Sequence, residues 1–117
     1  MFRRIDTVFL RVRNLDAALA WYTEHLGLTV RWRQPGVGCL NVAETPLTLL
    51  EATDGFTPAS EPTFNFYAAD IDGVYQRLQQ AGVVVDDQIT DSPGVRWFDF
   101  QDPDGNRLEV CWFPEGE

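Results

Sequence analysis

The first hydrophobic pattern in the chain is an alternation of apolar and polar side chains over residues 7–12, which is typical of a β-strand with one covered face. The covered face would carry Val8, Leu10 and Val12, and the other face Thr7, Phe9 and Arg11. Apolar residues then recur every three or four positions, at Leu15, Ala18, Leu19, Tyr22 and Leu26. This spacing predicts a helix that begins after the N-cap residue Asn14 and ends at Gly27.

The same two patterns return in the second half of the chain. An alternation over residues 63–68 places Thr63, Asn65 and Tyr67 on one face, and a helical spacing follows between Asp70 and Gly82. Thr7 and Thr63 lie 56 positions apart, as do Asp16 and Asp72. We interpret this correspondence as an internal duplication.

Short strand-like segments follow each predicted helix. They cover residues 29–33, 39–43 and 47–52 in the first half, and 83–86, 95–101 and 107–112 in the second. The turn "DPDG" at 102–105 carries Pro and Gly where a β-turn requires them, so the last two segments should form a hairpin. The sequence therefore predicts an α+β domain of two βαβββ modules, residues 1–53 and 63–117, joined by the linker 54–62.

Composition narrows the possible partners. The 117 residues include 18 acidic and 9 basic side chains, a net charge of −9, which argues against nucleic-acid binding and favours a cationic or neutral small molecule. No lysine is present, so Schiff-base chemistry through lysine is excluded, and His25 is the single histidine. No stretch has the length of a membrane span or a secretory signal, and we expect a cytoplasmic protein whose Cys39 and Cys111 are reduced core thiols.

Candidate ligand-binding residues are those that face away from the helices. The alternation leaves Arg107, Glu109 and Cys111 on the open face of the last strand. In the first half Leu47, Leu49 and Glu51 share a face, and Glu51 precedes Glu109 by 58 positions, so we expect both glutamates to face a common concavity. The predicted lining around them consists of Thr7, Phe9, Arg11, Leu49, Thr63, Asn65, Tyr67, Trp97 and Cys111.

Three segments carry a family resemblance: "DTVFLRVRNLDAALAWYTEHLGL", "FNFYAADIDGVYQRLQQAGV" and "FDFQDPDGNRLEV". They cover nearly the whole chain, which resembles the vicinal oxygen chelate superfamily of glyoxalase I, extradiol dioxygenases, and fosfomycin and bleomycin resistance proteins. The resemblance implies that the two modules form a curved mixed sheet around a cleft, and that the protein is a homodimer.

The resemblance also implies where a metal would bind. Metal-dependent members have a histidine early in the first strand, a glutamate on the fourth, a histidine on the fifth and a glutamate on the eighth. Here Glu51 and Glu109 take the glutamate positions, but Thr7 and Thr63 take the histidine positions. A hydroxyl is a poor donor for zinc or iron, and two carboxylates with water would hold magnesium or manganese only weakly. We therefore expect no cofactor, with a weakly bound divalent cation as the alternative.

Two neighbouring carboxylates in a cleft require compensation, which a shared proton, an ion pair with Arg11 or Arg107, or a cationic ligand would provide. The arginine pairing would make the glutamates structural. With a cationic ligand, the protein would be a metal-free binder of a flat or cationic compound held between aromatic walls. The enzymatic alternative is a lyase, isomerase or dioxygenase in which Glu51 or Glu109 acts as general base. A third alternative is a pocket retained only as a dimer scaffold.

Overall fold

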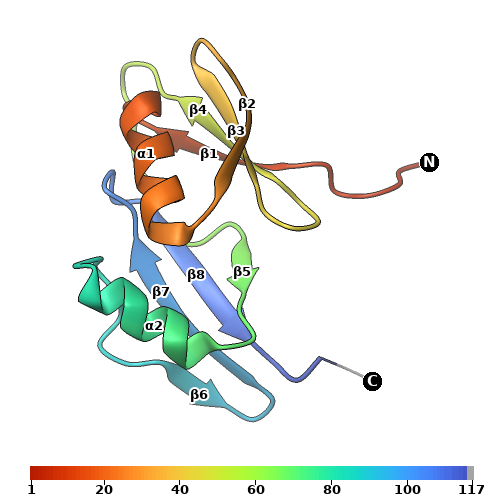
Figure 1. Ribbon diagram of the computed structural model, residues 1–117, viewed down its shortest axis with the longest axis vertical. Helices are drawn as coiled ribbons and strands as arrows, with labels where there is room; N and C mark the ends of the chain where they lie inside the picture. Colours follow the sequence, from red (N-terminus) through yellow and green to blue (C-terminus); the bar gives the residue numbers. More distant parts are fainter. Residues whose placement is uncertain (116–117) are drawn as a thin grey trace. The chain divides into compact units, whose positions relative to one another are not determined.

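The chain folds as two successive βαβββ modules, as the sequence predicts (Figure 1). The computed structural model describes residues 1–115. Chain contacts divide into two compact units, one of residues 1–58 and the other beginning at Ala59. None of the helices in the described residues is long and apolar enough to cross a membrane.

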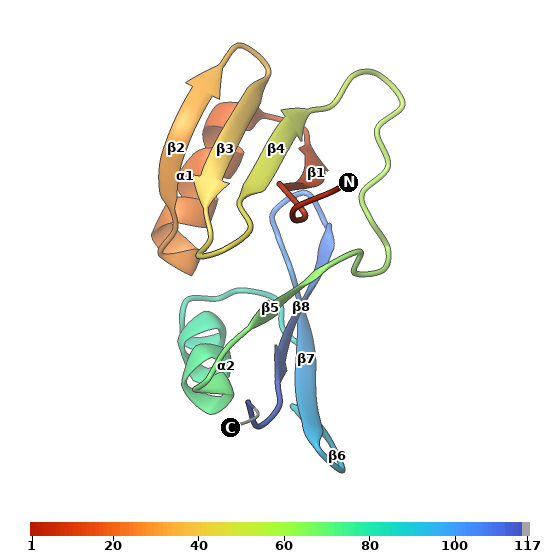
Figure 2. The ribbon, with the colours of Figure 1, turned by 90° about the vertical axis from the view of Figure 1, so that its right-hand side faces the viewer.

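The first module is a four-stranded mixed sheet with one helix on it. Its elements are β1 (Val8–Val12), α1 (Leu15–Leu26), β2 (Thr29–Gln34), β3 (Val37–Asn41) and β4 (Leu47–Glu51). The strand order is β1-β4-β3-β2, in which β1 runs parallel to β4 and the other pairs are antiparallel. Figure 2 shows α1 lying across one face of this sheet.

The ends of α1 confirm the predicted caps. The side chain of Asn14 accepts a hydrogen bond from the backbone N–H of Ala17, at 2.9 Å. At the other end Gly27 adopts a left-handed conformation with φ 69°, which glycine reaches without steric cost.

The second module repeats this plan with β5 (Asn65–Tyr67), α2 (Ile71–Gln80), β6 (Thr90–Ser92), β7 (Val95–Gln101) and β8 (Arg107–Trp112). The strand order is β5-β8-β7-β6, and β5 runs parallel to β8. Asp70 caps α2 by accepting from the N–H of Gly73, as predicted.

One predicted strand of the second module is wrong. Residues 83–86 form only an isolated bridge, Val85 to Phe100, and the outer strand is β6, which the sequence analysis missed. The pairing beside Phe100 stops early because the side chain of Asp86, rather than a backbone carbonyl, accepts the N–H of Asp99. The chain then leaves β7 and returns as β6, pairing Thr90 with Trp97.

Each module buries the helix-facing side of its sheet. The first core includes Leu10, Val12, Leu47 and Leu49, and the second includes Phe98, Phe100, Leu108 and Val110. Residues paired across neighbouring strands project to the same side, so the register fixes which residues lie on the opposite, open side.

The turn between β7 and β8 sets the register of the second module. Asp102 is buried, and its carboxylate accepts the backbone N–H groups of Asp104 and Asn106 and the side-chain amide of Asn106. The oxygen of the Asn106 amide accepts the N–H of Ala59, which ties the connecting segment to the turn. Asp99 is thereby placed directly opposite Glu109.

Candidate functional site: the open face of the second sheet

Two rows of side chains cross the open face of the second sheet. The register pairs Asn65 with Glu109 and Glu109 with Asp99, so these three lie side by side on β5, β8 and β7. The next row, two residues along, consists of Tyr67, Cys111 and Trp97. The predicted orientations of Asn65, Tyr67, Trp97, Glu109 and Cys111 are therefore confirmed, whereas their roles in binding stay predictions.

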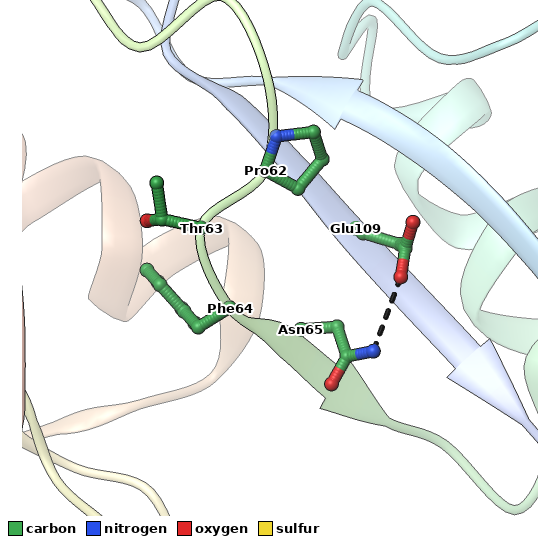
Figure 3. Close-up of a pocket in the computed structure, with 5 residues that line it drawn as sticks. All are labelled: Pro62, Thr63, Phe64, Asn65 and Glu109. Atoms are coloured by element: carbon green, nitrogen blue, oxygen red, sulfur yellow. Dashed lines mark hydrogen bonds between the residues drawn. The ribbon is translucent and has the colours of Figure 1, made fainter.

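Glu109 lies beside a hollow in the protein surface. The hollow has a volume of about 290 Å³ and is lined by Pro62, Thr63, Phe64, Asn65 and Glu109. Figure 3 shows the side chains of Asn65 and Glu109 turned toward each other. The amide of Asn65 donates to Oε1 of Glu109 at 3.1 Å, so the hydrogen-bond partner of this carboxylate is neutral.

The aromatic row borders the acidic one. Tyr67 packs edge-on against Phe113 with ring centroids 5.0 Å apart, and its hydroxyl donates to the Phe113 carbonyl at 2.9 Å. Both rings remain substantially exposed, and Trp97 is half-buried. In the register, Tyr67 on β5 and Trp97 on β7 flank Cys111 on β8, and Cys111 is buried.

Cys111 is a neutral thiol near neutral pH. Burial raises its pKa, and the negative charge of Glu109 raises the pKa further. Burial is also the largest cause of the raised pKa of Tyr67, followed by the charge of Glu115 and, at a pH where its thiol has ionised, that of Cys111. A protonated, buried thiol is a poor nucleophile, so the burial and protonation of Cys111 argue against covalent chemistry at this residue.

Arg107 does not compensate Glu109, so the pairing with Arg107 that the sequence suggested is wrong. Its Nε donates to Oδ2 of Asp99 at 2.8 Å, and a terminal nitrogen contacts Oδ1 of Asp86 at 3.0 Å. Asp86 in turn accepts the backbone N–H of Asp99 at 2.9 Å. Asp86 and Asp99 are not among the residues predicted from the sequence, although the alternation that places Trp97 on the open face also places Asp99 there.

The open face of the first sheet carries different residues. Phe9 pairs with Thr48, and Thr48 pairs with Cys39, so these three form its central row. Thr48 is buried, and its hydroxyl lies 2.7 Å from that of Thr7. Phe9 is exposed, and the alternation along β1 places Arg11 on the same side, as predicted.

The predicted position of Glu51 is wrong. Glu51 pairs with Val12, and Leu49 with Leu10, so both lie on the helix-facing side of their sheet. Leu49 has no exposed surface, which also removes it from the predicted lining. Oε2 of Glu51 accepts the backbone N–H of Leu15 at 2.8 Å, so this carboxylate stabilises the start of α1.

The error has a physical cause in the lengths of the connections. The modules are offset by 56 positions at β1 and β5, which makes Phe9 the counterpart of Asn65. Phe9 pairs with Thr48 and Asn65 pairs with Glu109, so the counterpart of Glu109 is Thr48, 61 positions earlier. Most of the additional residues lie between α2 and β7, where residues 83–86 and β6 take the place of the single strand β2. The expected pair of equivalent carboxylates therefore does not exist.

The side chains at the family's metal-ligand positions do not fit a resident metal. With Thr48 in place of Glu51, as the register requires, they are Thr7 and Thr48 in the first module and Thr63 and Glu109 in the second, that is, three hydroxyls and one carboxylate. Threonine hydroxyls are poor donors for transition metals. Elsewhere in residues 1–115, no group of three or more His, Cys, Asp or Glu side chains is arranged to hold an ion.

Comparisons with known proteins agree with this architecture. The chain is 27% identical to YwbC, an uncharacterized protein of Bacillus subtilis (strain 168), over 93% of this chain and 97% of that one. It is 26% identical to TnmS3, an antibiotic binding protein from Streptomyces sp. CB03234, whose structure matches with a TM-score of 0.83 over 96% of this chain and 97% of that one.

The chain is also similar to an enzyme, at the same sequence identity as to TnmS3. The lactoylglutathione lyase of Agrobacterium tumefaciens is 26% identical, with a TM-score of 0.75 over 93% of this chain and 92% of that one. Residues 4–110, which span both βαβββ modules, match the Glyoxalase/Bleomycin resistance protein/Dioxygenase superfamily, and the chain belongs to that superfamily.

Proposed function

We propose that this protein is a metal-free binder of a flat, cationic small molecule, which it holds on the open face of its second module. The observation that carries the proposal is the environment of Glu109. Its carboxylate lies beside a hollow and is bound to a neutral amide, while Arg107 is occupied by Asp86 and Asp99. A carboxylate in this setting suits a cationic group of a ligand.

The neighbouring row supplies the surface for a flat ring. Tyr67 and Trp97 present aromatic side chains two residues along the strands from Asn65 and Asp99, at a distance of roughly 7 Å along the sheet. Aromatic faces stack on planar ligands and also attract cations. A ligand that combines a planar ring with a positive group would contact both rows.

Charge on the second module supports the same class of ligand. Residues 59–117 contain twelve acidic and three basic side chains, whereas residues 1–58 contain six of each. The net negative charge of the chain therefore comes from the module that carries Glu109. Such a field raises the local concentration of cations and accelerates their association.

The relatives bear on the choice between binding and catalysis. The similarity to an antibiotic binding protein supports binding, while the similarity to a lyase supports the enzymatic alternative. That alternative assigned the general base to Glu51 or Glu109, and Glu51 is engaged at the start of α1, which leaves Glu109 as its one candidate. Binding is therefore the function that the geometry supports better. The homodimer and the cytoplasmic location stay predictions.

The proposal is tested by titrating the protein with proflavine, a flat aromatic cation near neutral pH. We expect Glu109→Gln to weaken proflavine binding about tenfold, as measured by calorimetry, because it removes a charge-assisted contact but keeps the shape of the side chain. Glu24→Gln, the same change at an exposed position on α1, is the control and should bind like the native protein. If Glu109→Gln and the native protein bound proflavine with equal affinity, the Glu109 carboxylate would not contribute to binding.

The metal-free character is tested on the same preparation. Magnesium, manganese and zinc should leave the thermal unfolding temperature unchanged, since a ligand that binds the folded state raises it. Stoichiometric metal in protein purified without chelators would contradict this part of the proposal.

A further inference from the structure

We infer that Asp86 and Asp99 are positioning residues, which keep Glu109 available to a cationic ligand by holding Arg107 away from it. This inference rests on the proposed function, because it explains why the site would accept a cation. Neither aspartate needs to contact the ligand.

The register places Arg107 within reach of two competing carboxylates. Arg107 and Glu109 are two residues apart on β8 and lie on the same side of the sheet. Asp99 is directly opposite Glu109 on β7, and so is the diagonal neighbour of Arg107. Geometry alone would therefore allow Arg107 to pair with either acid, and pairing with Glu109 would cancel the charge that the ligand requires.

Asp86 determines which carboxylate Arg107 binds. Its segment lies beside β7 through the bridge from Val85 to Phe100, on the edge of β7 opposite to β8. Arg107 reaches across β7 and binds both Asp99 and Asp86. Asp86 is itself held in place because it accepts the backbone N–H of Asp99. Two fixed acids on one side outweigh the single acid on the other, so the guanidinium is drawn over β7.

Glu109 turns the opposite way. Its carboxylate accepts from Asn65 on β5 and lines the hollow (Figure 3). Arg107 is held by Asp99 and Asp86 on the side of β7. The arrangement has a cost, since Oδ1 of Asp99 is buried without a hydrogen-bond partner among residues 1–115. An unpartnered buried carboxylate oxygen at this position is more readily explained by its effect on a site than by stability.

The test removes both holding charges at nearly constant shape. In the double variant Asp86→Asn with Asp99→Asn, Arg107 should pair with Glu109, and proflavine affinity should fall about tenfold, as expected when a neighbouring cation neutralises the anchoring carboxylate. Adding Arg107→Gln to the double variant should restore the affinity, because the competing cation is gone. Failure of the double variant to lose affinity, or of Arg107→Gln to restore it, would overturn the inference.

A matched control exists on the other side of the same sheet. Arg96 bridges Asp72 and Asp91 in the same way that Arg107 bridges Asp86 and Asp99, but it pairs with Trp112 on the helix-facing side. Asp72→Asn with Asp91→Asn should leave proflavine affinity unchanged. Acridine, a similar ring that is largely uncharged near neutral pH, should bind all variants alike, whereas general damage to the fold would weaken both ligands.

A measurement without ligand separates this inference from the proposed function. In the native background, Arg107→Gln and Glu109→Gln should have additive effects on the free energy of unfolding, because the two side chains are not paired. In the background of Asp86→Asn with Asp99→Asn, the same two changes should become coupled. If native protein does not bind proflavine, the proposed function fails, and the presence or absence of this coupling still decides whether the aspartates hold Arg107.

Discussion

The two modules share one topology and differ mainly on the open faces of their sheets. The row formed by Phe9, Thr48 and Cys39 in the first module corresponds to Asn65, Glu109 and Asp99 in the second. An exposed aromatic ring and two buried small side chains thus stand where the other module has an amide and two carboxylates. The comparison teaches that duplication preserved the helix-facing cores while the open faces diverged.

Charge follows the same division. The first module has equal numbers of acidic and basic residues, whereas the second has four times as many acidic as basic residues. Even so, the helix-facing positions remain equivalent, as Leu47 and Leu108 show: both are leucines with 1% exposure at corresponding positions on β4 and β8.

The largest effect is expected where the modules are most alike. Leu47→Ala and Leu108→Ala should each lower the free energy of unfolding by about 3 kcal/mol, because each leaves a cavity in a packed core. Urea unfolding can be followed by tryptophan fluorescence, since each module contains two tryptophans. If one substitution lowered the free energy of unfolding several times less than the other, the two cores would not be equivalent.

A smaller effect is expected from exchanging the residues that differ. Thr48→Glu should destabilise the protein by about 2 kcal/mol, because it places a carboxylate at a buried position and removes the hydroxyl contact to Thr7. The reciprocal change, Glu109→Thr, should cost less than about 0.5 kcal/mol, since Glu109 is half-buried and not part of a core. If urea titration gave equal losses of unfolding free energy for Thr48→Glu and Glu109→Thr, the open faces would be more alike than the register indicates.

The smallest change in stability is expected at Glu51 and Glu109, the two glutamates that the sequence suggested were equivalent. Glu51→Gln should lower the free energy of unfolding by about 0.5 kcal/mol, because it removes a negative charge from the start of α1. It should leave proflavine binding unchanged. Glu109→Gln should do the reverse, weakening binding with little change in stability. Loss of binding in Glu51→Gln, measured by the same calorimetry, would restore Glu51 to the site.

Much of the fold could be predicted from the sequence because its signals are local. Asn14, Gly27 and Asp70 mark helix ends through contacts within a few residues, and the structure confirms all three. The hairpin turn at 102–105 was equally clear, since its residues bond to one another. The outer strand β6 was missed because its three residues are all exposed and carry no hydrophobic alternation.

The candidate site was only partly predictable. Alternation correctly oriented Glu109, Tyr67 and Trp97, because each has an apolar neighbour on the covered face of its strand, namely Val110, Phe66 and Phe98. The same reasoning failed for Glu51, since the alternation along β4 shows which residues share a face but not which face the helix covers. The sequence suggested that Glu51 and Glu109 are equivalent at an offset of 58, close to the 56 of the first strands, but the longer connection before β7 makes the offset between β4 and β8 equal to 61.

By itself, the sequence determined the repeated βαβββ order, the ends of the helices and the acidic character of the second half, because these depend on neighbouring residues and on composition. The tertiary structure alone decided that Thr48 rather than Glu51 corresponds to Glu109, and that Arg107 pairs with Asp86 and Asp99. Both outcomes depend on strand register and on which of several carboxylates an arginine can reach, and these are set by contacts between residues far apart in the chain.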